Sequence, residues 1–362
     1  MEFKDIQNLK QLAGFLGTDK KTLDFYLKNK LIIHDFKKHK SRAHFKKSQV
    51  IKMYIPKKNK KLGYRVVFKI QDHTYKKINK EIFYHLKNVY NPPEYVQGFV
   101  KGRNIFTNAN MHLGKQKILN IDIKDFFQSI SFKQVNKAFI DLGYRKNIAK
   151  YLTQLTTIDN KLALGLNTSP ILANIVIAEM DKELLDLAEK YENVYSRYAD
   201  DMTFSSNSLI PLINEISDII KKYGFLLNKK KTKIMKRGQK QYVTGLTVFD
   251  NKSPRIPKKY KKRIRQLLFY INKYGFMNHL MHVNDVNKYD FIKNPTLIYY
   301  FYFERTRMEF KLKGWIDYIN SVEPKFAQKL YKQYNQIDFY RDITIFGLAL
   351  ERIQDSKKNN KK

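Results

Sequence analysis

The 362-residue sequence contains no cysteine, a single tryptophan and few acidic residues. Without cysteine the chain cannot form a disulfide framework, a Cys-ligated zinc site or an iron–sulfur cluster, and this composition suits a reducing cytoplasm. Long apolar runs are also missing. The best one, residues 171–178, is interrupted by Asn174 and is far shorter than the roughly 20 residues that a membrane span needs. The N-terminus lacks the order of a signal peptide. We therefore expect a cytoplasmic protein with no membrane partner.

The scarcity of acids leaves a large positive charge. With 70 Lys and Arg against 33 Asp and Glu, the formal net charge is +37, which favours a polyanionic partner. Nucleic acid is the first candidate, because each phosphate contact releases counterions. A base-biased genome would also enrich lysine, but it explains so large an imbalance poorly. Because 43% of the residues are hydrophobic, the chain can still bury a core, and its length predicts two or three subdomains.

Apolar periodicity and turn residues predict the order of the elements. Two N-terminal helices are expected within residues 1–30, separated at Gly17, with Thr18 as the cap of the second helix. Strands and helices alternate over residues 118–248, and a basic helical region follows Pro254. Three further elements are expected: a strand at 64–70, a helix at 76–90 and a strand at 242–248.

Three of the few acids lie where predicted strands end. Asp122 follows the apolar residues 118–121, and Asp200 and Asp201 are adjacent in a tight turn between two strand-like segments. An Asp-Asp pair can serve turn chemistry alone. Carboxylates from neighbouring strands, however, are what two divalent ions about 4 Å apart require for phosphoryl transfer. Magnesium prefers such oxygen ligands. The pattern therefore predicts a site for two Mg²⁺ ions, with Mn²⁺ as a substitute.

Five ordered motifs carry a resemblance to a known family. Residues 198–201 (Tyr-Ala-Asp-Asp) and 122–127 resemble the catalytic motifs of reverse transcriptases. Residues 108–112 (Asn-Ala-Asn-Met-His) and 243–245 (Val-Thr-Gly) resemble two elements of bacterial retron reverse transcriptases. A fifth segment, residues 164–170, resembles the motif that usually reads Pro-Gln-Gly followed by small residues and Ser-Pro. The resemblance covers residues from about 50 to 270.

The resemblance implies an α+β fold of the right-hand polymerase type, with fingers, a palm containing an antiparallel sheet, and a mainly helical thumb. We expect the N-terminal helices and fingers at 1–115 and the palm at 116–250, with residues 140–175 contributing to the fingers. A basic helical thumb and tail are expected at 253–362.

The resemblance also assigns residues to the reaction. It implies that Asp122, Asp200 and Asp201 are catalytic and bind the metal ions, with Asp201 the less direct ligand. Four residues are implied to bind the nucleotide: Arg65, Phe127, Gly165 and Lys231. Phe127 would exclude a 2′-hydroxyl, although packing beside Phe126 is an alternative.

Two parts of this assignment stay open. Residues 229–231 are three contiguous lysines, so the choice among them is not settled by sequence, and a solvated basic turn is the alternative. Either Lys58 or Lys61 would add charge near Arg65. Leu164 replaces the glutamine of the usual motif, which puts one nucleotide contact in doubt.

A further set of residues is predicted to bind nucleic acid. Some belong to the two retron-type elements and the others to the basic segment after Pro257: Asn108, His112, Val243, Thr244, Gly245, Lys258, Lys259, Lys262, Arg263 and Arg265. Local packing is the alternative for His112, and a solvated helix face is the alternative for the basic segment. Ser169 is expected to cap a helix that begins with Pro170 and runs to about residue 190.

The function implied is RNA-templated DNA synthesis from deoxynucleoside triphosphates. The resemblance implies a structured non-coding RNA as template and primer, a branched RNA–DNA product, and a defence role against phage with a separate effector protein. Two alternatives remain open at the level of sequence. One is another bacterial defence or intron-type reverse transcriptase, and the other is a non-catalytic RNA-binding scaffold.

Overall fold

The computed structural model describes residues 5–38, 42–57, 63–294 and 296–339. The chain forms two compact units, whose boundary lies between Thr244 and Gly245. This boundary precedes the expected palm–thumb junction at 250–253, so the first unit contains the expected fingers and the expected palm only as far as Thr244. The finer division into subdomains stays a prediction. Lys58 and Lys61 lie outside the described residues.

The first unit begins with the expected helix pair, α1 (Leu9–Phe15) and α2 (Lys20–Lys28). Gly17 lies in the turn between them with a φ of 64°, a value that glycine adopts without steric cost. The predicted cap was wrong by one residue, because the carboxylate of Asp19, and not Thr18, accepts a hydrogen bond from the Thr22 amide (2.9 Å).

A three-stranded sheet follows, in the order β1-β2-β3. Its strands are β1 (Ile33–Asp35), β2 (Val50–Pro56) and β3 (Tyr64–Ile70), with α3 (Arg42–Lys47) between the first two. The strand predicted at 64–70 is confirmed as β3. The helix predicted at 76–90 is α4 (His73–Val89), whose buried side is spaced at three and four residues: Tyr75, Ile78, Ile82 and Leu86.

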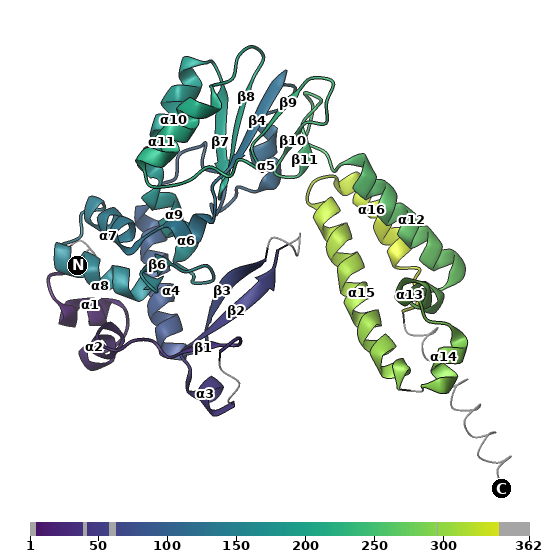
Figure 1. Cartoon of the computed structure of the whole chain (residues 1–362), viewed down its shortest axis with the longest axis horizontal. Helices are drawn as coiled ribbons and strands as arrows, with labels where there is room; N and C mark the ends of the chain where they lie inside the picture. The colour runs from purple at the N-terminus through teal and green to yellow at the C-terminus, as the bar shows by residue number, and fades with distance from the viewer. Residues whose placement is uncertain (1–4, 39–41, 58–62, 295, 340–362) are drawn as a thin grey trace, which may run out of the picture. The chain divides into compact units, whose positions relative to one another are not determined.

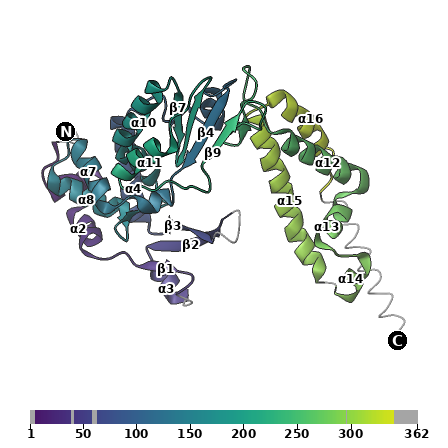
Figure 2. The same ribbon diagram turned by 45° about the horizontal axis from the view of Figure 1, so that its top comes forward.

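The central sheet has four antiparallel strands in the order β7-β8-β4-β9. They are β4 (Lys117–Asp122), β7 (Val194–Tyr198), β8 (Asp201–Ser206) and β9 (Lys233–Lys236). This is the antiparallel palm sheet that was predicted. Because side chains alternate along a strand, Met202 and Phe204 of β8 lie on one face of the sheet, and Asp201, Thr203 and Ser205 lie on the other. Helices α10 (Ala178–Lys190) and α11 (Ile213–Lys222) lie side by side along this sheet (Figures 1 and 2).

The remaining elements of the first unit lie between α4 and β4, between β4 and β7, and after β9. They are α5 (Ile105–Asn110), α6 (Phe126–Ser129), α7 (Phe132–Asp141), α8 (Lys146–Thr156), α9 (Ser169–Val176), β5 (Thr157–Ile158), β6 (Lys161–Leu162) and β10 (Tyr242–Val243). Apart from α5 and β10, these elements contribute apolar side chains to one continuous core with α1, α2 and α4. The core therefore extends beneath the central sheet and fixes it against the N-terminal helices.

Two predicted elements differ from the structure. The single helix expected from Ser169 to about residue 190 is broken at Ile177 into α9 and α10. Ser169 does not cap it, since its hydroxyl donates to the carbonyl of Ala163 (2.6 Å) inside the protein. The strand expected at 242–248 is interrupted at Thr244 and Gly245, whose φ values are 45° and 84°.

The second unit is helical in its described part, as predicted. It opens with β11 (Leu246–Thr247) and continues with α12 (Lys258–Tyr274), α13 (Phe276–Asn284), α14 (Lys288–Lys293), α15 (Leu297–Asn320) and α16 (Pro324–Tyr334). Lys261 on α12 forms an ion pair with Glu323, which precedes α16 (2.9 Å). None of the helices in the described ranges is long and apolar enough to cross a membrane.

Candidate active site

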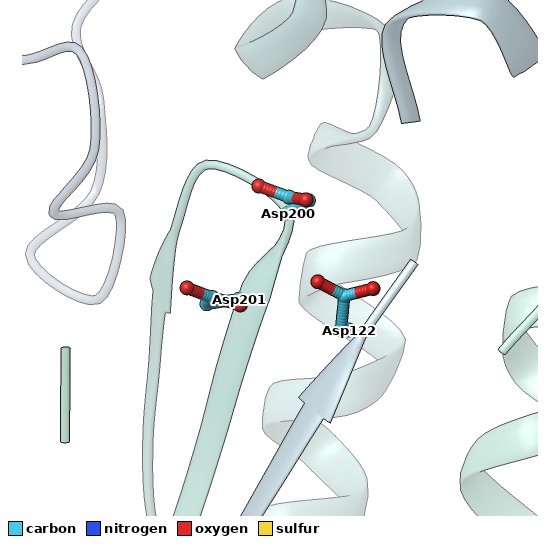
Figure 3. A group of neighbouring side chains, drawn as sticks. All are labelled: Asp122, Asp200 and Asp201. Atoms are coloured by element: carbon cyan, nitrogen blue, oxygen red, sulfur yellow. The ribbon is translucent and has the colours of Figure 1, made fainter. Parts of the chain in front are cut away.

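Three carboxylates meet at one end of the central sheet. Asp122 is the last residue of β4 and Asp201 is the first residue of β8, and the two are directly paired across the strands. Residues paired in this way place their side chains on the same face. Asp200 lies in the turn between β7 and β8, next to this pair (Figure 3). One oxygen atom from each carboxylate lies within 4.8 Å of the others.

The turn that carries Asp200 has an unusual backbone. Ala199 has a φ of 58°, a left-handed conformation that is uncommon for a residue other than glycine. The carbonyl of Asp200 accepts a hydrogen bond from the amide of Ile123 (3.2 Å). The turn is therefore tied to the residue that follows Asp122, which brings the two strand ends together.

The three carboxylates repel one another electrostatically. Removal from bulk water, together with the negative charges of Asp200 and Asp122, raises the pKa of Asp201 to about 7. Burial and the charge of Asp122 also raise the pKa of Asp200. Carboxyl groups that resist ionisation in this way are stabilised when a cation binds between them.

Lys231 is the nearest cation in the structure. Its ammonium lies 2.5 Å from Oδ2 of Asp122, and Asn228 donates to Oδ1 of the same carboxylate (2.9 Å). Although partial burial opposes the charge on Lys231, the hydrogen bond to Asp122 and the negative charges of the cluster raise the pKa of its ammonium group. Geometry thus separates Lys231 from Lys229 and Lys230, which sequence alone could not do.

The donor set fits divalent metal ions. It consists of carboxylate oxygens, the ligands that Mg²⁺ prefers, and it leaves room for water and phosphate oxygens. Among the residues that the structure describes, this is the one cluster of three His, Cys, Asp or Glu side chains close enough to hold a metal ion.

The two phenylalanines after the first carboxylate have different environments. Phe126 is buried, and its ring packs against that of Phe225. Phe127 is only half-buried, with its ring 5.9 Å from that of Phe99. The Phe127 ring also packs against the core, with its centroid 5.3 Å from that of Phe126, so the packing alternative stands beside the predicted contact with a nucleotide.

The other two predicted nucleotide-binding residues lie on or against β3. Arg65 is exposed on β3, opposite Ile55 of β2. Gly165 has a φ of 114°, and a Cβ atom there would lie 2.0 Å from the carbonyl oxygen of Phe68. The close backbone approach that this glycine permits is thus to β3. Its neighbour Leu164 accepts a hydrogen bond from the Phe68 amide (2.7 Å) through its backbone carbonyl.

Asn108 and His112 lie inside the protein, where neither side chain is available to nucleic acid. The ring of His112 hydrogen-bonds with Ser205 through Nδ1 and with Ser196 through Nε2, both at 2.7 Å. Ser196 donates its one hydroxyl proton to Asn108 (2.7 Å), so it accepts from Nε2. Burial lowers the pKa of the imidazole to about 3, so the ring is neutral at pH 7 and its Nδ1 accepts from Ser205. The structure therefore agrees with the alternative that His112 serves local packing. Its two hydrogen bonds connect the segment after α5 to β7 and β8.

The Val-Thr-Gly element joins the same region. Val243 is fully buried, so its side chain does not reach nucleic acid in this structure. The hydroxyl of Thr244 donates to the carbonyl of Ile105 (3.0 Å) and accepts a long hydrogen bond from Asn108 (3.5 Å). Gly245 is exposed.

The predicted basic residues of the second unit are all exposed on α12: Lys258, Lys259, Lys262, Arg263 and Arg265. Most of them line a surface hollow together with Lys261 and Phe326. Arg265 lies over the ring of Phe326, with 5.9 Å between the guanidinium carbon and the ring centroid. Cations beside an aromatic ring suit a nucleic-acid backbone with exposed bases, and the role of these residues stays a prediction.

Residues that sequence reasoning missed surround the carboxylates. Asn228 holds Asp122, and Arg197 is buried beneath the turn beside Asp181 and Asn174. The signal for Arg197 was its place as the one charged residue of a strand that contains Val194, Tyr195 and Tyr198, where a buried charge needs a partner. That partner, Asp181, lies on another element, and local sequence does not identify it.

The comparison with known proteins agrees with this geometry. Residues 55–266, more than half of the chain, match the family model described as reverse transcriptase (RNA-dependent DNA polymerase). The chain belongs to the reverse transcriptase family. The right-hand polymerase fold predicted from the motifs is the fold of this family, and the resemblance to retron reverse transcriptases is confirmed by the relatives that follow.

Three relatives are reverse transcriptases of retrons. The retron Mx65 reverse transcriptase of Myxococcus xanthus is 35% identical over 193 residues, which are 47% of this chain and 44% of the relative. The retron Ec86 enzyme of Escherichia coli is 36% identical over 177 residues (48% and 55%). The retron Ec73 enzyme of Escherichia coli is 31% identical over 258 residues (66% and 73%). The chain thus spans about half the length of the first two relatives.

Proposed function

We propose that this chain is an RNA-directed DNA polymerase of the retron type. The observation that carries the proposal is the cluster of Asp122, Asp200 and Asp201, whose oxygen atoms approach within 4.8 Å in a chain of the reverse transcriptase family. The raised pKa of Asp201 supports it, since a bound cation would relieve the repulsion among these carboxylates.

Asp122, Asp200 and Asp201 would hold two Mg²⁺ ions, or Mn²⁺ in their place. When bound there, the ions would activate the attacking hydroxyl and stabilise charge on the leaving phosphate. Asn228 fixes the orientation of the Asp122 carboxylate through its hydrogen bond.

The substrate is proposed to lie beside this cluster. Lys231, which contacts Asp122, would donate a proton to the leaving pyrophosphate. The half-buried ring of Phe127 would exclude a 2′-hydroxyl, and the exposed Arg65 would bind the triphosphate through its planar guanidinium. Gly165 would admit the same nucleotide by keeping the loop close to β3.

We propose further that the template and primer are parts of one structured non-coding RNA. A 2′-hydroxyl of that RNA would prime synthesis, and the product would be a branched RNA–DNA molecule. The retron relatives support this choice over another defence or intron-type enzyme. We also propose a cytoplasmic location, and a role in phage defence together with a separate effector protein. The defence role and the effector rest on the resemblance to retron enzymes.

The first test is to sequence the nucleic acid that co-purifies with the protein and to supply deoxynucleotides with Mg²⁺. We expect one short RNA covalently joined to DNA, and further incorporation on the bound template. RNA that stays free of DNA, with no incorporation by the native protein, would favour the non-catalytic scaffold. Incorporation on intron-like RNA without a branched product would favour the intron-type alternative.

A further inference from the structure

A buried arginine lies directly below the turn that carries Asp200. Arg197 is the second-last residue of β7, and its side chain has no exposed surface. Side chains alternate along β7, so Arg197 faces away from Ser196 and the His112 network. The guanidinium is thus enclosed on the face of the sheet that is opposite to the polar network.

The guanidinium connects three elements. Its Nε and Nη2 atoms bind the carboxylate of Asp181 on α10, with Nη2 2.7 Å from Oδ2. Its Nη1 atom donates to Oδ1 of Asn174 on α9 (2.9 Å) and to the carbonyl of Ala199 (3.2 Å). Ala199 is the residue with the left-handed backbone conformation. The Nη1 atom of Arg197 therefore donates to the carbonyl of a strained residue.

A second segment closes over the same turn. The backbone of Arg197 accepts hydrogen bonds from the amides of Gln97 (2.8 Å) and Gly98 (3.3 Å). Asn174 donates to the carbonyl of Gly98 (3.0 Å). A Cβ atom at Gly98 would lie 2.3 Å from the backbone nitrogen of Ala199. The turn is therefore packed so tightly that a methyl group at Gly98 would force it to move.

The buried ion pair of Arg197 and Asp181 carries a free-energy cost of desolvation. Burying two opposite charges requires desolvation that their attraction only partly offsets, so a buried ion pair is weak evidence for stability. A left-handed alanine likewise persists only where its surroundings fix it. The guanidinium of Arg197 and the left-handed backbone conformation both involve Ala199, the residue before Asp200. Arg197 therefore reaches the carboxylate cluster only through the backbone of this turn.

We propose that Arg197 is a positioning residue, whose buried pair with Asp181 holds the Ala199–Asp200 turn so that the Asp200 carboxylate meets that of Asp122 in metal-binding geometry. This inference rests on the proposed function in one respect, namely that the cluster binds divalent ions. It adds a residue that lies outside the motif's carboxylates and acts through the backbone.

The test measures Mn²⁺ binding to the purified protein by electron paramagnetic resonance, which needs no catalytic turnover. The first variant is Arg197→Lys, which keeps the charge beside Asp181 but lacks the planar fork that reaches Ala199. We expect the Mn²⁺ concentration for half-saturation to rise roughly tenfold or more, as for other residues that orient metal ligands. Unchanged Mn²⁺ affinity would overturn the proposal.

A second variant removes both charges and keeps the volume, namely Arg197→Met with Asp181→Leu. An apolar pair of this kind often preserves the stability of a fold, so weakened Mn²⁺ binding with an unchanged unfolding midpoint supports positioning. The matched control is Lys222→Gln with Glu183→Gln, which removes an exposed ion pair of 2.6 Å. We expect the control to bind Mn²⁺ like the wild type.

A third variant moves the turn from the other side. Gly98→Ala should weaken Mn²⁺ binding, because the added methyl group displaces Ala199. Gly14→Ala, with nothing within 4 Å of the new Cβ, should leave Mn²⁺ binding unchanged. Loss of cooperative unfolding in all three variants would assign Arg197 a structural role alone and would overturn the proposal. A wild-type protein that binds Mn²⁺ but incorporates no deoxynucleotide would refute the polymerase function and leave the proposal on Arg197 standing.

Discussion

In a chain with a net charge of +37, three carboxylates lie together at one site. The three carboxylates are close enough to repel one another, and Lys231 offsets part of that repulsion through its contact with Asp122. Neighbouring lysines at 229 and 230 are exposed and make no such contact in the structure. Contact geometry therefore favours Lys231 over its two neighbours for the proposed role near the triphosphate, a choice that three contiguous lysines in a sequence do not reveal.

Replacement of Lys231 tests its assignment. Lys231→Ala should lower kcat for deoxynucleotide incorporation roughly tenfold or more, because a positioned proton donor contributes at least that much. Lys230→Ala is the matched control and should stay close to the wild type. Single-turnover incorporation measures both rates. Equal rates for the two variants would contradict the role given to Lys231.

The buried His112 predicts how stability depends on pH. Burial lowers the pKa of its imidazole from 6.5 to about 3, so the unfolded chain binds a proton at a higher pH than the folded chain does. The contribution of the neutral ring to the free energy of unfolding is fully present above pH 6.5, and it is lost as the pH falls toward 3. At pH 5 the loss is about 2 kcal/mol, at about 1.4 kcal/mol for each pH unit.

The measurement is the free energy of unfolding of the wild type and of His112→Gln between pH 7 and 5. The wild type should lose more stability over this range, by the amount above, because glutamine does not titrate. Burial also lowers the pKa of His85, to about 4, and its contribution cancels in the comparison. Parallel pH profiles would contradict the neutral buried ring.

At the scale of elements, sequence pattern predicts the strands that carry the carboxylates. Alternation and an apolar run that ends in Asp122 were enough to identify β4, and the hairpin of β7 and β8 follows from its aromatic and β-branched residues. The predicted helix 169–190 failed at Ile177, where the chain leaves helical geometry without a glycine or proline to mark it. Such breaks depend on packing between distant elements, which a local pattern does not contain.

Contacts between elements explain the other differences. Asn108 and His112 were predicted to bind nucleic acid, but their partners Ser196 and Ser205 lie about 90 residues away in the chain. Only the fold brings them together. The same holds for Arg197, since Asp181 and Asn174 come from two separate helices. Charge, motif order and strand pattern could be predicted, whereas the burial of polar side chains could not.

Gly165 gives a prediction about how the loop before α9 meets β3. Gly165→Ala should destabilise the protein by roughly 1–3 kcal/mol, because a Cβ atom would collide with the Phe68 carbonyl. Gly63→Ala is a matched control, since Gly63 also has a positive φ (78°) but open space around its Cβ position. Urea unfolding measures the difference. Equal losses would show that the approach to β3 is not tight.

At the scale of the whole molecule, the net charge of +37 is unevenly distributed. The exposed cations of α12 are predicted to bind phosphate, whereas three of the 33 acids lie together at the end of the central sheet. Lys262→Ala should therefore reduce the slope of log affinity against log salt for RNA by about 1. Lys137→Ala, which removes a lysine already paired with Asp141 (2.5 Å), should leave the slope unchanged. An unchanged slope for both would contradict the predicted contact.

The most direct test of the central claim is single-turnover deoxynucleotide incorporation with Mg²⁺ on a primed RNA template. We compare the wild type with the variant Asp200→Asn, Asp201→Asn and with a control, Asp141→Asn, Asp218→Asn, which removes two exposed carboxylates that pair with lysines. The first variant should lose roughly a thousandfold or more in rate, since metal ligation supplies several kcal/mol, and the control should retain the wild-type rate. Incorporation by the first variant at the wild-type rate would contradict the assignment of these carboxylates to catalysis.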